Sequence, residues 1–277
     1  MTERLISRAE ICKLIALSGF LISVVTSLGG CASNPSIAAT TGKADFITAS
    51  DETDARKRAR IRLELAVGYF EQGKTTTALD ELKQSINADP TLFEAYNLRG
   101  LIYMRLNDVG LAEESFRRAL VINPKASNVQ HNYGWLLCQQ LRMPEAVQMF
   151  SAAIADPNYG DRAKTWMTQG LCQMKIGKAA EAEDSLAHSY ELDAGNPITG
   201  YNLALLQFNR GEFVRAQFYV RRLNNSELAN SESLWLGIKV ERRMENREAM
   251  LQLASQLKKR FPQSKELALY EKGAFNE

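Results

Sequence analysis

Apolar and small residues return along the chain with a period of about 34 residues. One position carries only Ala or Gly and recurs at intervals of 34, 34, 36, 34 and 33 residues, and a second small position follows it twelve residues later in every period. A period of this length predicts stacked helix-turn-helix units, in which a small residue lets two antiparallel helices approach closely. The first position holds Ala66, Gly100, Gly134, Gly170, Ala204 and Gly237, and the second holds Ala78, Ala112, Ala146, Ala182, Ala216 and Ala249.

The second unit matches the tetratricopeptide pattern almost position for position, through Tyr96, Gly100, Tyr103, Ala112, Phe116, Ala119 and Pro124. We therefore predict an all-α fold, a right-handed tetratricopeptide-repeat superhelix of about six repeats with a C-terminal capping helix. The first and fifth repeats match less well, because Arg62 and Gly200 stand where the pattern has a bulky residue. The expected repeats are residues 59–92, 93–126, 127–160, 163–196, 197–229 and 230–263, followed by the cap at residues 264–277.

The first 30 residues predict an export signal, because basic residues precede an apolar run from Leu14 to Leu28. This run is about 15 residues long, shorter than the ~20 residues of a membrane-spanning helix. Its end, Leu28-Gly29-Gly30-Cys31, resembles the bacterial lipoprotein signal. That resemblance implies cleavage after residues 1–30 and lipidation of Cys31, and a permanent transmembrane anchor is the alternative.

The segment after Cys31 is poor in large apolar residues and predicts a flexible tether over residues 31–53, ahead of a repeat domain over residues 54–277. Ala32 follows Cys31, where the lipoprotein sorting scheme that this resembles has Asp for inner-membrane retention. The resemblance thus implies a protein that is lipid-anchored to the outer membrane and faces the periplasm.

Charge and cysteine usage narrow the picture further. The formal net charge is only +2, and so small a net charge does not indicate a nucleic-acid-binding protein. The basic run at residues 56–62 has two open interpretations, contact with anionic lipid or a solvated helix face. Once Cys12 leaves with the signal and Cys31 is lipidated, Cys138 and Cys172 remain as the candidate disulfide, with two buried thiols as the alternative.

In tetratricopeptide repeats the first helix of each unit lines the concave groove, and the corresponding positions here are mostly apolar. They predict a binding site for a peptide, helix or strand, unless neighbouring helices bury them as ordinary core. The predicted groove residues are Leu63, Val67, Phe70, Asn97, Leu101, Met104, His131, Trp135, Met167, Leu171, Met174, Tyr201, Leu205 and Phe208.

Nothing in the sequence predicts catalysis. The two histidines, His131 and His188, stand in no metal-ligand or nucleophile spacing, and the glycines form no phosphate-binding loop. We therefore expect no enzyme activity, cofactor, metal, small-molecule substrate or nucleic-acid partner.

The lipoprotein signal, the six repeats and the segments at residues 131–138 and 233–239 together resemble the type IV pilus biogenesis and stability lipoproteins, the PilF/PilW family. The resemblance implies a pilotin, which helps the outer-membrane secretin of the pilus to reach its membrane and assemble, and so supports twitching motility. The alternative is an adaptor for another envelope process, such as regulation of cell-wall hydrolases or outer-membrane protein assembly.

Overall fold

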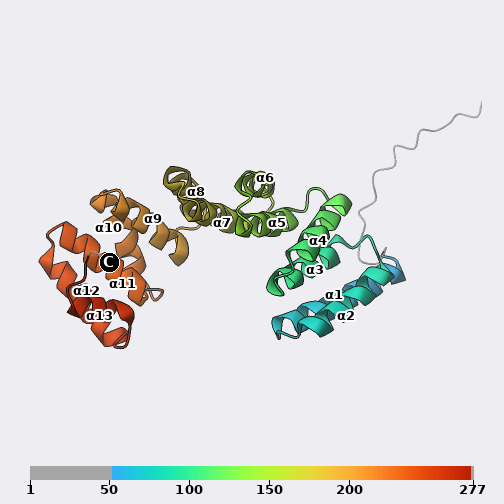
Figure 1. Ribbon diagram of the computed structural model, residues 1–277, viewed down its shortest axis with the longest axis horizontal. Coiled ribbons are helices and arrows are strands. Elements are labelled where there is room, and N and C mark those ends of the chain that lie inside the picture. The colour runs from blue at the N-terminus through green and yellow to red at the C-terminus, as the bar shows by residue number, and fades with distance from the viewer. Residues whose placement is uncertain (1–51, 276–277) are drawn as a thin grey trace, which may run out of the picture. The chain divides into compact units, whose positions relative to one another are not determined.

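A computed structural model describes residues 52–275, and within this range the secondary structure is entirely α-helical (Figure 1). Six helix pairs are followed by one short helix, which confirms the predicted all-α tetratricopeptide superhelix. The thirteen helices of the described range are α1 (Asp54–Glu71), α2 (Thr75–Ala88), α3 (Phe93–Arg105), α4 (Val109–Ile122), α5 (Ser127–Gln139), α6 (Met143–Ile154), α7 (Arg162–Lys175), α8 (Ala179–Leu192), α9 (Pro197–Asn209), α10 (Phe213–Asn224), α11 (Ser231–Arg243), α12 (Arg247–Arg260) and α13 (Lys265–Glu271).

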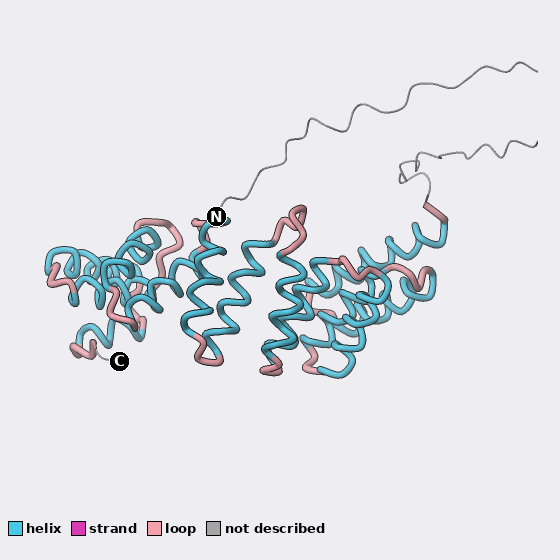
Figure 2. The backbone as a smooth tube through the Cα atoms, turned by 90° about the horizontal axis from the view of Figure 1, so that it is seen from above, coloured by secondary structure: helices cyan, strands magenta, loops and turns pink. Residues whose placement is uncertain are grey.

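Each of the odd-numbered helices α1 to α11 packs along the even-numbered helix that follows it, and consecutive pairs stack on one another. Figure 2 shows the paired helices running antiparallel, joined by short turns at alternate ends. Consecutive odd-numbered helices also contact each other: α1 contacts α3, α3 contacts α5, α5 contacts α7, and α9 contacts α11. They therefore line the same side of the stack, and α13 packs on α11 and α12 at its end.

The small residues hold the two helices of a pair close together, as the sequence predicted. A Cβ atom added at Gly100 would lie 2.6 Å from the Phe116 ring, and one at Gly134 would lie 2.8 Å from the Phe150 ring. Such distances exclude any larger side chain unless the helices separate. Of the second set of small residues, Ala249 alone is half-buried rather than buried.

Side-chain caps and prolines explain where many helices begin and end. The side chains of Thr53, Asp108, Asn196, Asn230, Asn246 and Ser264 each accept a hydrogen bond from a backbone N–H in the first turn of the following helix. Pro124 follows α4 and prevents its continuation. Pro197 instead opens α9, where its missing N–H costs nothing.

The helix bounds refine the expected repeats. The first helix begins at Asp54, where the folded domain was expected to start, and so precedes the first repeat boundary at residue 59. The cap was expected at residues 264–277, and its helix spans Lys265–Glu271. The predicted signal peptide, Cys31 and most of the predicted tether lie outside the described residues.

The turn inside every helix pair places one residue in the left-handed backbone region. Three of these residues are glycine, but Leu141 and Glu245 adopt φ values of 60° and 58°. Bulky side chains are sterically strained in this region, whereas Gly is not and Asn is less so. The six equivalent positions are Gly73, Asn107, Leu141, Gly177, Gly211 and Glu245.

We predict that Leu141→Gly stabilises the protein by about 0.5–1 kcal/mol, because it removes left-handed strain while the exposed leucine has little packing to lose. Urea unfolding of the full chain measures the change. The matched control is Leu106→Gly, another exposed leucine but with ordinary helical φ, which should destabilise the protein. An unchanged or lowered stability of Leu141→Gly would contradict the assignment of strain.

Candidate protein-binding groove

The predicted groove residues lie on the odd-numbered helices, and most of them are accessible. Eleven of the fourteen are half-buried, while Val67 and Trp135 are each 38% exposed. Several of them, including Leu101, Met104 and Met167, also pack against the buried core. These side chains therefore lie at the edge of the core and remain partly accessible. The sequence analysis had treated a binding surface and a buried core as alternatives, and the structure combines the two.

Polar contacts join neighbouring odd-numbered helices along this side of the stack. Asn132 of α5 donates to the Asn97 side chain of α3, with 3.0 Å between Nδ2 and Oδ1. The Arg105 guanidinium lies 5.4 Å from the centre of the Phe70 ring and donates to the Phe70 carbonyl oxygen. These contacts fix how successive repeats sit against one another, and thereby the curvature of the groove.

His131 is a core residue, so its assignment to the groove was wrong. Its side chain is only 7% exposed, its Nδ1 lies 2.8 Å from the Thr165 hydroxyl, and its ring centre lies 6.0 Å from that of Phe150. The next repeat covers it, because α7 contributes Thr165. Burial, with the nearby Lys164 ammonium, lowers the pKa of His131 to about 4, so the imidazole is neutral at pH 7.

Cys138 of α5 and Cys172 of α7 form a disulfide, with their Cα atoms 5.9 Å apart. Both are buried, and they join the third and fourth repeats along the odd-numbered helices. The bond therefore reinforces the same row of helices that carries the groove.

The C-terminal end of the groove contains residues that the sequence analysis did not assign. Lys239 of α11 faces Tyr201 and Leu205 of α9 around a pocket of about 200 Å³. Trp235 of α11 also lines this pocket, but its side chain is only 6% exposed and belongs mainly to the core. Lys239 lies 5.5 Å from the Phe208 ring centre, and burial lowers the pKa of its ammonium. The sequence could have pointed to this end of the stack through Trp235, a large aromatic residue in the sixth repeat. Its indole stacks on Phe275 with ring centres 5.4 Å apart.

Three of the five basic residues in the run at residues 56–62 form ion pairs within the fold. Arg56 pairs with Asp89 at 2.6 Å, Arg60 with Glu52 at 2.8 Å and Arg62 with Glu81 at 2.9 Å. These ion pairs favour the helix-face interpretation of the run over a lipid-binding one.

The described residues contain no cluster of three or more His, Cys, Asp or Glu side chains placed to hold a metal ion. Within residues 52–275, none of the helices has the length and apolar character needed to cross a membrane.

Comparison with known proteins identifies the family. One family model, described as TPR repeat, matches residues 68–107, and another, described as tetratricopeptide repeat, matches residues 93–126. The type IV pilus assembly protein PilF of Pseudomonas aeruginosa is 28% identical over 204 residues, which make up 74% of this chain and 81% of that protein. A solved structure from the functional characterisation of Pseudomonas aeruginosa PilF is 26% identical, with a TM-score of 0.71, and the match covers 80% of this chain and 100% of that one.

The crystal structure of PilW, described as a widely conserved type IV pilus biogenesis factor, is 30% identical, with a TM-score of 0.66 over 76% of this chain and 97% of that one. The chain belongs to the PilF/PilW family of type IV pilus tetratricopeptide-repeat proteins. The PilF and PilW relatives are described through pilus assembly and biogenesis, and repeats of this kind bind proteins. Membership of the PilF/PilW family therefore favours a scaffold over an enzyme.

We predict that replacing both Cys138 and Cys172 by Ala destabilises the middle of the stack by about 2–4 kcal/mol, because the bond closes a long loop in the unfolded chain. In a repeat protein the loss stays mostly local. Hydrogen exchange should therefore accelerate in α5 to α8 and remain unchanged in α11 and α12.

Reduction of the wild-type disulfide serves as the control and should give the same exchange pattern as the double variant. Equal exchange in the oxidised and reduced proteins would show that the bond adds no stability.

Proposed function

We propose that this chain is a lipid-anchored outer-membrane scaffold of type IV pilus biogenesis, which binds the pilus secretin and promotes its localisation and multimerisation. The family relationship to PilF and PilW carries the proposal. The partly accessible apolar side chains along the odd-numbered helices support it, because apolar surface on a stack of repeats suits a peptide, helix or strand of another protein.

Lipidation of Cys31 is the proposed means of anchoring. Several acyl chains on one residue hold a protein firmly on a membrane, whereas a single chain binds only marginally. Residues 32–53 then separate the anchor from α1 and give the repeat domain reach into the periplasm. The scaffold thus holds secretin subunits near the membrane in which they assemble.

We expect the amount of heat- and detergent-resistant secretin multimer in outer-membrane fractions to fall when the gene is deleted or when Cys31→Ser removes the acylation site. The control is Cys12→Ser, which changes a cysteine inside the predicted signal and should leave the multimer unchanged. A normal multimer level and normal twitching motility in the deletion strain would overturn the secretin role and favour an adaptor for another envelope process.

We predict that Trp135→Glu weakens secretin binding by about tenfold or more, because it places a carboxylate where a half-exposed aromatic anchor contributes to the apolar surface. Binding of the full chain to purified secretin, measured by calorimetry, gives the affinity. Val214→Glu is the matched control, since Val214 is 71% exposed on the even-numbered helix α10. Equal weakening by the two variants, or by neither, would remove Trp135 from the binding site.

A further inference from the structure

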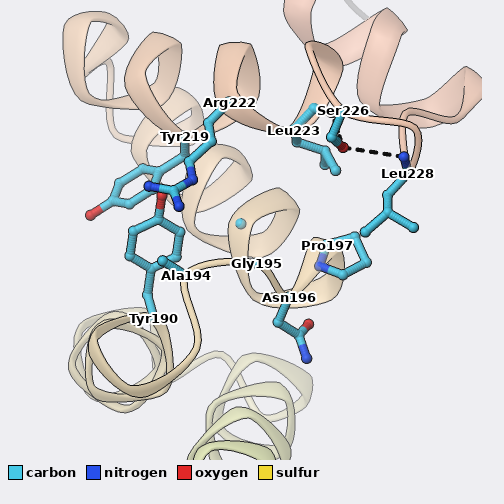
Figure 3. Close-up of a pocket in the computed structure, with 11 residues that line it drawn as sticks. Tyr190, Ala194, Gly195, Asn196, Pro197, Tyr219, Arg222, Leu223, Ser226 and Leu228 are labelled. Carbon is cyan, nitrogen blue, oxygen red and sulfur yellow. Dashed lines mark hydrogen bonds between the residues drawn. The ribbon is translucent and has the colours of Figure 1, made fainter.

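A pocket of about 340 Å³ lies between the α8–α9 loop and helix α10, away from the fourteen groove positions. The loop contributes Ala194 and Asn196, and α10 contributes Tyr219, Arg222 and Leu223. Figure 3 shows Tyr190, Tyr219 and Arg222 along one side and Pro197, Leu223 and Leu228 along the other. Its volume falls at the lower end of the range of ~300–1,000 Å³ found for ligand pockets.

The pocket exists because one repeat lacks a side chain. Gly200 is buried on α9, yet a Cβ atom added there would meet no other atom within 4 Å. The residues in the same register of the second, third and fourth repeats are Tyr96, Gln130 and Trp166. The pocket therefore occupies the place that a large side chain takes in those repeats.

Hydrogen bonds in the intact repeats support this correspondence. Tyr96 donates its hydroxyl to the Pro90 carbonyl at 3.2 Å, and Gln130 donates its amide to the Pro124 carbonyl at 2.8 Å. In each case the acceptor stands six residues before the donor. The residue six before Gly200 is Ala194, which lines the pocket, and no side chain of the described residues donates to its carbonyl oxygen.

A second position in the repeats indicates which kind of group fits. The residue 22 positions after each aromatic ring covers that ring: the Arg118 guanidinium lies 5.8 Å from the Tyr96 ring centre, and the His188 ring lies 4.7 Å from that of Trp166. The residue 22 positions after Gly200 is Arg222. Arg222 thus stands in the position of the covering group in a repeat that has no ring at the matching position, and its guanidinium lies 5.7 Å from the centre of the Tyr190 ring at the pocket rim.

The other three repeats show that the pairing is not incidental. Their residues in this register are Arg62, Gln130 and Ser233, and the residues 22 positions later are Gln84, Ala152 and Ser255. None of these pairs combines a ring with a covering group. The covering group accompanies a ring in this register in the second and fourth repeats. In the fifth repeat the register position is Gly200, and the pocket beside it leaves space for a ring next to Arg222 and Tyr190.

We propose that this pocket binds an aromatic side chain of a partner protein, which takes the place of the ring absent at Gly200 and lies under the Arg222 guanidinium. The proposal rests on the scaffold function above and names a second contact for its partner. A cation over an aromatic face contributes about 0.5–2 kcal/mol, and Leu223 and Leu228 supply apolar contact for the ring edge. The pocket rim also includes Tyr190, whose hydroxyl is buried without a hydrogen-bond partner among the described residues and can pair with a tyrosine hydroxyl.

Binding of p-cresol, the tyrosine side-chain analogue, to the full chain in detergent tests the pocket directly by ligand-detected NMR. We expect saturable binding on the order of 1 mM, as suits so small a ligand. We also expect 4-methylcyclohexanol, which has a similar size but no aromatic face, to bind more weakly. Absence of saturable p-cresol binding, or equal binding of the two compounds, would overturn the proposal.

Two substitutions at Gly200 separate filling of the pocket from loss of the glycine. Gly200→Tyr restores the residue type of the second repeat and should raise the unfolding temperature while abolishing p-cresol binding. Gly200→Ala is the matched control, which improves helix propensity but leaves most of the pocket empty and should retain binding. Undiminished binding to a folded Gly200→Tyr protein would overturn the assignment of the site.

Arg222→Gln provides an independent variant, since the exposed Arg222 side chain can be replaced without disturbing the core. Loss of the cation should weaken p-cresol binding about threefold to tenfold. Unchanged affinity would refute the role of the guanidinium.

The amount of secretin multimer in cells tests whether the secretin supplies the aromatic side chain that enters the pocket. If the pocket holds a secretin side chain, Gly200→Tyr lowers the multimer and Gly200→Ala does not; equal multimer in the two strains overturns this part of the proposal. If deletion of the gene leaves the multimer intact, the scaffold function is overturned. The p-cresol measurement then still tests whether the pocket binds an aromatic group. Phe46 is the one aromatic residue in the sequence segment 31–53. If p-cresol binds the Phe46→Ala protein but not the wild-type protein, the chain's own N-terminal segment occupies the pocket, and the proposal of a partner protein is overturned.

Discussion

The close approach of the two helices in each pair is the constraint on which the rest of the structure depends. Gly100 and Gly134 leave no space for a Cβ atom beside Phe116 and Phe150. Because each ring fills the space opposite its glycine, the offset between the helices is set within narrow limits. The same offset returns in successive repeats, and the stacking of neighbouring pairs follows from it.

That repeated offset brings the odd-numbered helices to one side, where bonds between neighbouring repeats accumulate. The Asn97–Asn132 hydrogen bond, the His131–Thr165 contact and the Cys138–Cys172 disulfide all join adjacent odd-numbered helices. A binding surface made of residues from successive repeats keeps its spacing only if the repeats keep theirs. The cross-links therefore support the groove mechanically, and the disulfide does so without using surface that a partner could contact.

Periodicity could predict the helix pairs, the capping helix and the helices on which the candidate groove residues lie, because those features follow from residues within one repeat. It could not predict the burial of His131, which depends on Thr165 in the next repeat. Nor could it find the contact between Trp235 and Phe275, since Phe275 lies beyond the last repeat. The left-handed turn at Leu141 was equally hidden, because the turn geometry overrides the preference of the residue that occupies it.

The position of Gly200 illustrates how a repeat protein can give up a core side chain. Stability in such a stack is close to a sum over repeats and their neighbours, so a deficit in one repeat is carried by the pairs on either side. The fifth repeat keeps Ala204, Ala216 and Val220 fully buried, which preserves its internal packing. A vacancy at the position facing the preceding loop then leaves a preformed pocket at modest cost to the fold. Departures from the repeat pattern are for this reason the places where a scaffold built from similar units acquires specificity for one partner.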